Sequence, residues 1–331
     1  MNLQGLKRIT LILLSGFCLP WVSYAQQMPL YSQYLYNKFL INPAVAGSDG
    51  YTSFNLTARE QWVGYSGAPR TYSFSWQTRF LKRSYILKQA GPRRQIYRPK
   101  SDGRVGMGGF VFSDKNGLTR RTGFQASYAY HTWLRQETQL SMGLAFTGYH
   151  FRIDERDITF EDMGEPWLYN EFRKGVFIPD AAFGIHLLNA RYSFGFSADQ
   201  LFGAAAKLGN EAYRRLKMDR HYYLFGSYTF TDMRYHELQP SFLIKMSEQL
   251  DPQADIGLTY IYNQSLWAGL AYRTGGSVIA SIGVKYDRLW MGYSFDFAFQ
   301  EIQRLTYGSH ELTIALKFGD STRRYRWLDR Y

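Results

Sequence analysis

Apolar and polar residues alternate at every second position along most of this chain, which is the period of a β-strand with one apolar face. The segment ELTIALKF at 311–318 places Leu, Ile, Leu and Phe on one face and Glu, Thr, Ala and Lys on the other. The segments SVIASIGVKY at 277–286 and QLSMGLAFT at 139–147 repeat this arrangement. The pattern predicts strands that turn one face toward an apolar environment.

Fourteen segments show this strand pattern, and most are about ten residues long. They span 51–62, 70–81, 103–113, 120–133, 138–151, 179–188, 191–198, 220–230, 236–246, 252–262, 265–273, 276–286, 288–298 and 308–319. The turns after the fourth, sixth, eighth, tenth and twelfth segments are short, whereas the connections 152–178 and 199–219 on the alternate side are long. Short turns at one end and long loops at the other are typical of a barrel inserted from the periplasm.

The expected fold class is therefore all-β, a transmembrane antiparallel β-barrel of outer-membrane type with about 14 strands. A soluble β-sandwich would show the same alternation. Three features favour the membrane: the segment length, aromatic residues near segment ends, and small polar residues on the inner face. Aromatic residues make up 18% of the chain and there are 30 glycines, without any long apolar run, which agrees with an outer-membrane barrel.

The first 25 residues have the pattern of a secretory signal peptide. Lys7 and Arg8 precede an apolar run at 9–19 that is too short to span a bilayer, and Ala25 offers a cleavage site before Gln26. A lipoprotein acylated at Cys18 is the alternative, but the bulky Phe17 before the cysteine disfavours it. We expect a signal peptide at 1–25, a luminal plug or periplasmic segment at 26–50, the barrel at 51–319, and a basic periplasmic tail at 320–331.

Charge and cysteine content limit the kinds of site and the kinds of partner that the protein is expected to have. Cys18 is the only cysteine, so the mature chain is expected to hold neither a disulfide nor a thiolate metal site. The formal charge is +12, and loss of Lys7 and Arg8 with the leader leaves about +10. An exported protein of this charge is expected to meet charged partners or polyanionic surfaces, and no nucleic acid.

One connection on the short-turn side is unusually long and basic. The segment 82–102 carries seven Lys and Arg residues, among them Arg93, Arg94 and Arg98, against one Asp. It is either a solvated loop or a periplasmic docking loop for an acidic partner. The tail 320–331, expected on the same side, is also basic and aromatic.

We find no catalytic motif in the sequence. The patterns H-E-x-x-H, G-x-x-x-x-G-K-[ST] and G-x-S-x-G are missing, and the six histidines are scattered. The segment starting at Asp114 begins like a calcium loop, but Gln125 stands where the last ligand is needed. We expect a protein that is not an enzyme and that has no cofactor.

The strand period places charges of both signs on the inner face. They are Asp255, Arg273, Lys285, Asp296, Glu311 and Lys317. Such a set suits either the wall of a water-filled porin or a salt-bridged, plugged interior, so a passive outer-membrane diffusion channel is the alternative function.

Several long motifs occur in the order found in a known family. They are YSQYLYNKFLINPAVAG at 31–47, REQWVGYSGAPRT at 59–71, PDAAFGIHL at 179–187, HYYLFGSYTF at 221–230, ELQPSFLIK at 237–245, LWAGLAYRTG at 266–275 and GSHELTIALKFG at 308–319. From about residue 30 to 319 the chain resembles the PorP/SprF family of the type IX secretion system. Val45 and the length of 82–102 depart from the family pattern.

The resemblance implies an outer-membrane barrel of a Gram-negative bacterium that works with the components of the secretion machinery. It also implies a role in the export, or the retention at the cell surface, of a large secreted protein, commonly a gliding adhesin.

Two motifs supply the candidate partner-binding residues. The segment before the first strand contributes Tyr34, Asn37, Asn42, Pro43 and Gly47. The loop WVGYSGAP contributes Trp62, Gly64, Gly67 and Pro69. This loop is either a tight hairpin with Trp62 at the lipid–water interface, or a fixed loop that contacts the secreted protein or folds into the barrel mouth. Arg70, just past the break, would reach water or lipid headgroups.

Overall fold

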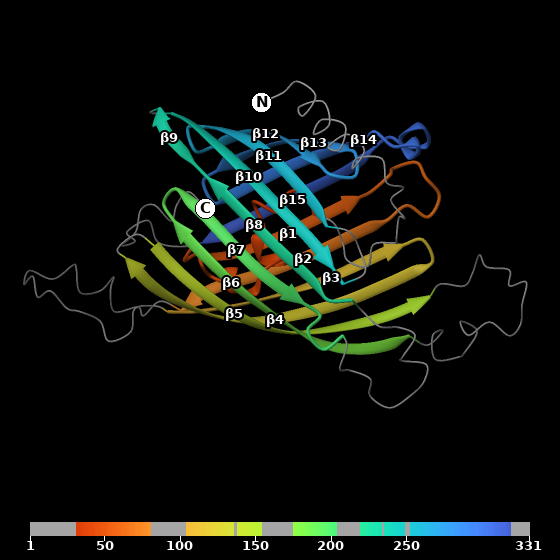
Figure 1. Ribbon diagram of the computed structural model, residues 1–331, viewed down its shortest axis with the longest axis horizontal. Helices are drawn as coiled ribbons and strands as arrows, with labels where there is room; N and C mark the ends of the chain where they lie inside the picture. Colours follow the sequence, from red (N-terminus) through yellow and green to blue (C-terminus); the bar gives the residue numbers. More distant parts are fainter. Residues whose placement is uncertain are drawn as a thin grey trace, which may run out of the picture.

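The alternating segments form a closed antiparallel β-barrel in which each strand pairs with the next along the chain (Figure 1). The first strand also pairs with the last, with Thr52 opposite Phe318 and Glu60 opposite His310, so the sheet has no free edge. The computed structural model describes residues 31–80, 104–135, 138–153, 175–203, 219–233, 235–248 and 252–318.

The strands lie close to the predicted boundaries. They are β1 (Thr52–Glu60), β2 (Arg70–Phe80), β3 (Val105–Asn116), β4 (Thr119–Arg135), β5 (Thr138–Ile153), β6 (Val176–Asn189), β7 (Tyr192–Asp199), β8 (His221–Tyr228), β9 (Phe230–Met233), β10 (His236–Ser247), β11 (Gln253–Tyr262), β12 (Leu266–Arg273), β13 (Ser277–Tyr286), β14 (Leu289–Ala298) and β15 (Ser309–Phe318).

β8 and β9 are two parts of one barrel strand, so these fifteen segments make fourteen strands and the prediction of fourteen is confirmed. Both parts pair with β10. The break falls at Thr229, whose backbone N–H donates to the Arg191 carbonyl at 2.6 Å. The sequence predicts a turn over 231–235, and this is wrong for 231–233, because β9 continues the strand to Met233.

The two faces of each strand are those that the alternation predicts. On β15 the side chains of Glu311 and Thr313 are buried inside the barrel, whereas Leu312 and Leu316 are exposed on the outside. Large apolar side chains, such as Leu144 on β5, cover the outer wall in the same way. A barrel with an apolar outer wall is suited to a lipid environment.

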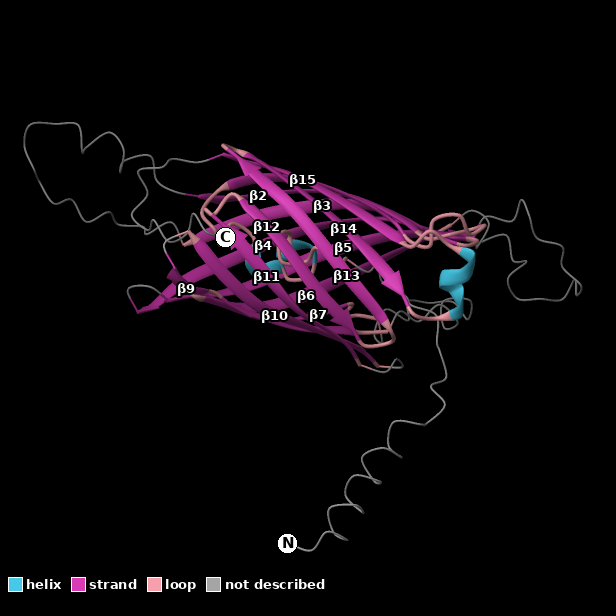
Figure 2. Ribbon diagram, turned by 90° about the horizontal axis from the view of Figure 1, so that it is seen from above, coloured by secondary structure: helices cyan, strands magenta, loops and turns pink. Residues whose placement is uncertain are grey.

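Residues 31–50, which we call the luminal segment, lie inside the barrel. Seventeen of these twenty residues are buried. The segment contains two short 3-10 turns, η1 (Lys38–Leu40) and η2 (Pro43–Val45), which lie between the strands in Figure 2. Another 3-10 turn of the described residues, η4 (Glu301–Leu305), lies between β14 and β15. None of the helical turns in the described residues is long and apolar enough to cross a lipid bilayer.

A small apolar core joins the luminal segment to the wall. Tyr34, Phe39 and Val45 of the segment pack in one cluster with Phe225 of β8 and Leu243 of β10. These two wall residues are inward-facing exceptions to the polar inner face, and they lie where the segment needs apolar contact.

Candidate functional site in the barrel lumen

A cluster of buried charges occupies one side of the lumen. Arg59 of β1 contacts Asp296 of β14 at 2.7 Å and Glu311 of β15 at 3.1 Å. Arg273 of β12 contacts Asp296 at 3.1 Å and Asp255 of β11 at 2.8 Å. None of these five residues is more than 5% exposed. The arginines share the carboxylates between them, which is the arrangement that makes burial of charge tolerable.

The start of the luminal segment is bound by this charge cluster. The backbone N–H groups of Ser32 and Gln33 donate to the two oxygens of Glu311, at 2.7 and 2.9 Å. The Ser32 hydroxyl donates to Asp296 at 2.7 Å and accepts from Arg59 at 2.7 Å. Asp296 and Glu311, two of the inward charges that the period predicts, therefore accept hydrogen bonds from the luminal segment as well as pairing with arginines of the wall.

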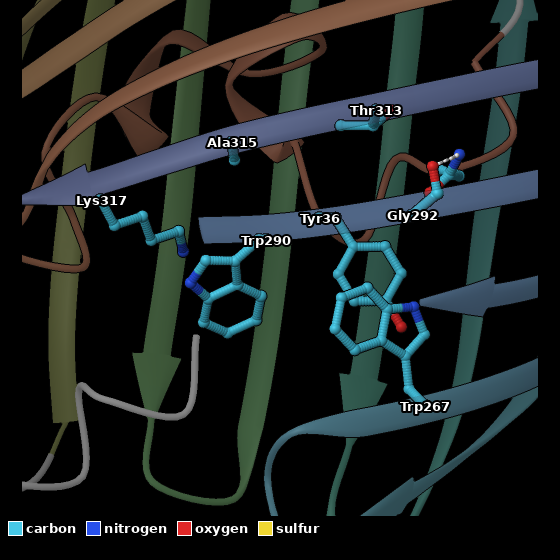
Figure 3. A pocket seen from close by; sticks show the side chains of 8 residues that line it. Tyr36, Trp267, Trp290, Gly292, Thr313, Ala315 and Lys317 are labelled. Carbon is cyan, nitrogen blue, oxygen red and sulfur yellow. Dashed lines mark hydrogen bonds between the residues drawn. The ribbon is translucent and has the colours of Figure 1, made fainter. Parts of the chain in front are cut away.

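Aromatic side chains extend this contact along the wall (Figure 3). The ring of Tyr36 stacks on Trp267 of β12 with centroids 4.6 Å apart. The Lys317 ammonium lies 4.6 Å from the ring centre of Trp290 and 3.3 Å from the Asp49 carboxylate. Both ends of the luminal segment thus bind side chains of β12–β15.

The opposite side of the lumen holds the segment through inward-facing glycines. We call Gly106 and Gly108 of β3, Gly143 of β5 and Gly184 of β6 the glycine cradle. A Cβ atom at Gly143 would lie 2.5 Å from the Ala44 Cα, and one at Gly108 would lie 2.8 Å from the Phe39 ring. Cβ atoms at Gly106 and Gly184 would overlap Ala46 and Asn42 in the same way. Only strands without side chains at these positions admit the segment so closely.

The five candidate residues before the first strand all lie in this lumen. Asn42 is fully buried, accepts from the Ala44 N–H at 2.8 Å, and donates to the carbonyls of β6 and β7 at 3.0 and 3.1 Å. Pro43 begins η2, and Asn37 donates to Ser75 of β2 at 3.3 Å. Gly47 has a φ of 66° and donates to Gln77 at 3.1 Å. Together with Tyr34 in the apolar core, these residues bind the barrel wall, and contact with a partner stays a prediction.

Lys38 is a charged residue of the segment that reaches the wall. Its ammonium donates to the Ser193 hydroxyl of β7 at 3.1 Å, and Ser193 is in turn 2.9 Å from His186. Burial lowers the pKa of the Lys38 amine, the nearby Lys317 lowers it further, and the Asp49 carboxylate acts in the opposite direction.

The four candidate residues of WVGYSGAP lie in the barrel rim. Trp62, Gly64 and Gly67 all have positive φ values, which lets the loop fold sharply. Val63 exchanges backbone hydrogen bonds with the loop before β15, and the Gly67 carbonyl accepts from Gly117 at 3.1 Å. The Pro69 carbonyl accepts from Gln61 at 2.9 Å. The loop is therefore fixed by two neighbouring rim loops, which agrees with either function that the sequence allows for it.

Some contact residues escape prediction from the sequence, and some predictions fall outside the structure. Ser32 and Gln33 lie in the motif at 31–47 but are not among its predicted site residues, and neither are the residues of the glycine cradle, although a glycine inside a strand signals close approach of another backbone. Arg93, Arg94 and Arg98, the rest of 82–102, the signal peptide and the tail 320–331 lie outside the described residues.

Comparisons with known proteins place the chain in a family. A family described as "Type IX secretion system membrane protein PorP/SprF" matches residues 23–316. A comparison with curated protein sequences found no match.

Among solved structures, the chain is similar to several bacterial barrels. The outer membrane protein Omp33 of Acinetobacter baumannii has 8% identity and a TM-score of 0.44, covering 82% of this chain and all 100% of Omp33. The Pseudomonas putida toluene transporter TodX has 10% identity and a TM-score of 0.42, covering 85% of this chain and 92% of TodX. These similarities are too low to carry an argument about substrate or partner.

Proposed function

This chain belongs to the PorP/SprF family of type IX secretion system membrane proteins, and we propose that it serves that system as a sealed, non-enzymatic outer-membrane barrel. Its task is the secretion, or the attachment at the cell surface, of a large secreted protein such as a gliding adhesin. The barrel anchors and docks its partners, and its lumen is not a route of transport.

The observation that supports a sealed barrel is the set of contacts of the luminal segment. The segment is hydrogen-bonded to Ser75 and Gln77 of β2, Gln139 of β5, Ser193 of β7 and Glu311 of β15. Each such bond contributes on the order of 1 kcal/mol, and those to charged groups contribute more. A fourteen-stranded barrel with an empty lumen would have room for water and small solutes, and here the luminal segment occupies that space.

Conductance tests this part of the proposal against the passive porin. The purified wild-type protein should give no large, steady channels in a planar lipid bilayer. A variant lacking residues 31–50 should conduct, provided that its mobility in gel electrophoresis still shifts on heating, as a folded barrel's does. Large, steady wild-type channels would contradict the proposal and favour the diffusion channel.

We propose the partner contacts from the charge of the connecting segments and from the end of the barrel at which each segment lies. The connection between β2 and β3, with Arg93, Arg94 and Arg98, and the tail 320–331 belong to the short-turn end, which we assign to the periplasm. We assign the long connections 152–178 and 199–219 to the exported protein. The basic segments dock acidic parts of the secretion machinery, because opposite charges favour close association.

Co-purification from native membranes tests these assignments. Replacing Arg93, Arg94 and Arg98 by Gln should lower recovery of periplasmic machinery while recovery of the exported protein is unchanged. Recovery with the wild type should itself fall at high salt, because exposed charges are screened. If the triple variant recovers the machinery as well as the wild type does, the segment 82–102 is only a solvated loop.

A further inference from the structure

Four cations form an uninterrupted row across the outside of the barrel. In the strand register, Arg70 of β2 lies opposite Lys115 of β3, Lys115 lies opposite Arg120 of β4, and Arg120 lies opposite Arg152 of β5. All four share the outer face with the exposed apolar side chains of their strands, and the Arg70 side chain is 59% exposed. We call these four residues the cation row.

Within the part of the chain that the structure describes, few carboxylates neutralise this row. Glu60 of β1 pairs with Arg70 at 3.7 Å. Among the described residues, no carboxylate forms an ion pair with Lys115, Arg120 or Arg152. Like charges directly opposite each other on neighbouring strands destabilise a sheet, and directly opposite Cβ atoms are only about 5 Å apart. Among the described residues the row thus has four cations and one paired carboxylate, an arrangement that favours binding of an external anion.

The next two rows of outward-facing side chains, further into β2–β5, differ from the cation row in their chemistry. Two residues further into each strand lie the polar side chains Tyr72, Ser113, Thr122 and His150, again opposite one another. Two residues further still come Phe74, Val111 and Phe124, all at least 40% exposed on the outside. The order from the rim is cationic, then hydrogen-bonding, then apolar, which matches the order phosphate, ester or sugar, and acyl chain in a membrane lipid.

We propose that the cation row binds the phosphate groups of an anionic lipid whose acyl chains lie along β2–β5. Arginine binds phosphate through two parallel N–H groups, and neighbouring cations in the row can share one phosphate. Continuity with the apolar wall favours a lipid over a soluble anion, which would gain nothing from Phe74, Val111 and Phe124. The orientation assumed in the proposed function puts this long-loop end at the cell surface, and the lipid therefore in the outer leaflet.

Lipid binding to the purified barrel tests the inference without any secretion partner. Native mass spectrometry would compare retention of three probes in detergent: bisphosphorylated lipid A, monophosphorylated lipid A with the same acyl chains, and phosphatidylcholine. The wild type should retain them in that order. The double variant Lys115→Gln/Arg120→Gln should bind bisphosphorylated lipid A more weakly by about fivefold for each cation removed.

A matched control removes the same charge elsewhere. Arg191→Gln/Arg288→Gln changes two exposed cations in the turns after β6 and β13, at the opposite end of the barrel, and should bind lipid A like the wild type. The cation-row variant should fold, since removing like charges relieves repulsion, and its heat-modifiable mobility verifies this. Inorganic phosphate at millimolar concentration should not displace the lipid.

Two results would overturn the inference. One is equal retention of bisphosphorylated lipid A by the folded cation-row variant and the wild type. The other is an equal loss of binding in the control variant, which would mean that the net charge of the protein, and not the cation row, determines lipid binding. Because neither result involves conductance or co-purification, failure here leaves the proposed secretion role standing, and failure of that role leaves lipid binding intact.

Discussion

Two sides of one lumen hold the same twenty-residue segment by different physical means. On the side of β1, β14 and β15, the carboxylates of Glu311 and Asp296 bind the backbone and hydroxyl of Ser32 through charge-assisted hydrogen bonds. On the side of β3, β5 and β6, the glycine cradle removes side chains so that the backbone around Ala44 lies directly against the strands. The first attachment depends on a few charged atoms, and the second depends on shape.

The difference bears on how the segment could be released. A bond to a charged group weakens when that group is neutralised, exchanged for another partner or screened, and the rest of the structure need not move. A close-packed contact has no such single determinant, because many atom pairs each contribute a small attraction. We expect the start of the segment to be the end that detaches first, with η2 held until the barrel wall itself changes.

The largest effect is expected from filling the cradle. In Gly143→Val, the new side chain must occupy the space of Ala44 and Pro43, whose backbone atoms lie 2.5 Å from a Cβ at this position. Overpacking of this kind costs more than about 3 kcal/mol when backbone is in the way. A single cysteine at Val45, buried in the parent protein, should then react with a thiol reagent more than about a hundredfold faster.

The control for this variant is another glycine of β5. The atoms nearest to a Cβ at Gly148 belong to the rings of Phe124 and Phe177, at 2.8 and 2.7 Å, and ring side chains can move aside. Gly148→Val should leave the cysteine at Val45 protected. Equal reactivity of the two valine variants would mean that strand damage, and not loss of the cradle, exposes the segment.

The barrel could be predicted from the sequence because lipid outside and a packed lumen inside impose a strict period of two. The segments that became β14 and β15 are predicted to within one residue at each end. The error at 231–233 has a local cause. Thr-Asp-Met-Arg-Tyr at 231–235 has the polar composition of a turn, but its first three residues belong to β9, which pairs with β10 beyond the break at Thr229. The composition of 231–235 does not show this pairing, because the pairing depends on contacts with β10.

The lumen could be predicted only in part. The period places Glu311, Asp296 and Arg273 on the inner face, as observed. Their contact with Ser32 and Gln33 joins residues up to 279 positions apart, and no local pattern carries that information. A strand glycine such as Gly143 signals close approach, but the sequence does not say which backbone approaches.

A smaller and more local effect is expected from the charged side. Glu311→Gln removes the negative charge that binds the N–H groups of Ser32 and Gln33, while Arg59 keeps its 2.7 Å contact with Asp296. Because Arg59 stays paired, the loss is that of charge-assisted hydrogen bonds, about 2 kcal/mol, and not that of an isolated buried charge. A single cysteine at Leu35 should become about thirtyfold more reactive, whereas one at Val45 should stay protected.

This selectivity is what separates the two attachments. Glu60→Gln is the matched control, because Glu60 lies on β1, which pairs with the β15 strand of Glu311. It removes only an exposed ion pair with Arg70, which contributes little to stability. This variant should change the reactivity of neither cysteine. If Glu311→Gln exposed both cysteines to the same degree, the segment would leave the lumen as one rigid unit. The charge cluster and the glycine cradle would then be parts of a single cooperative attachment, and the start of the segment could not be displaced alone.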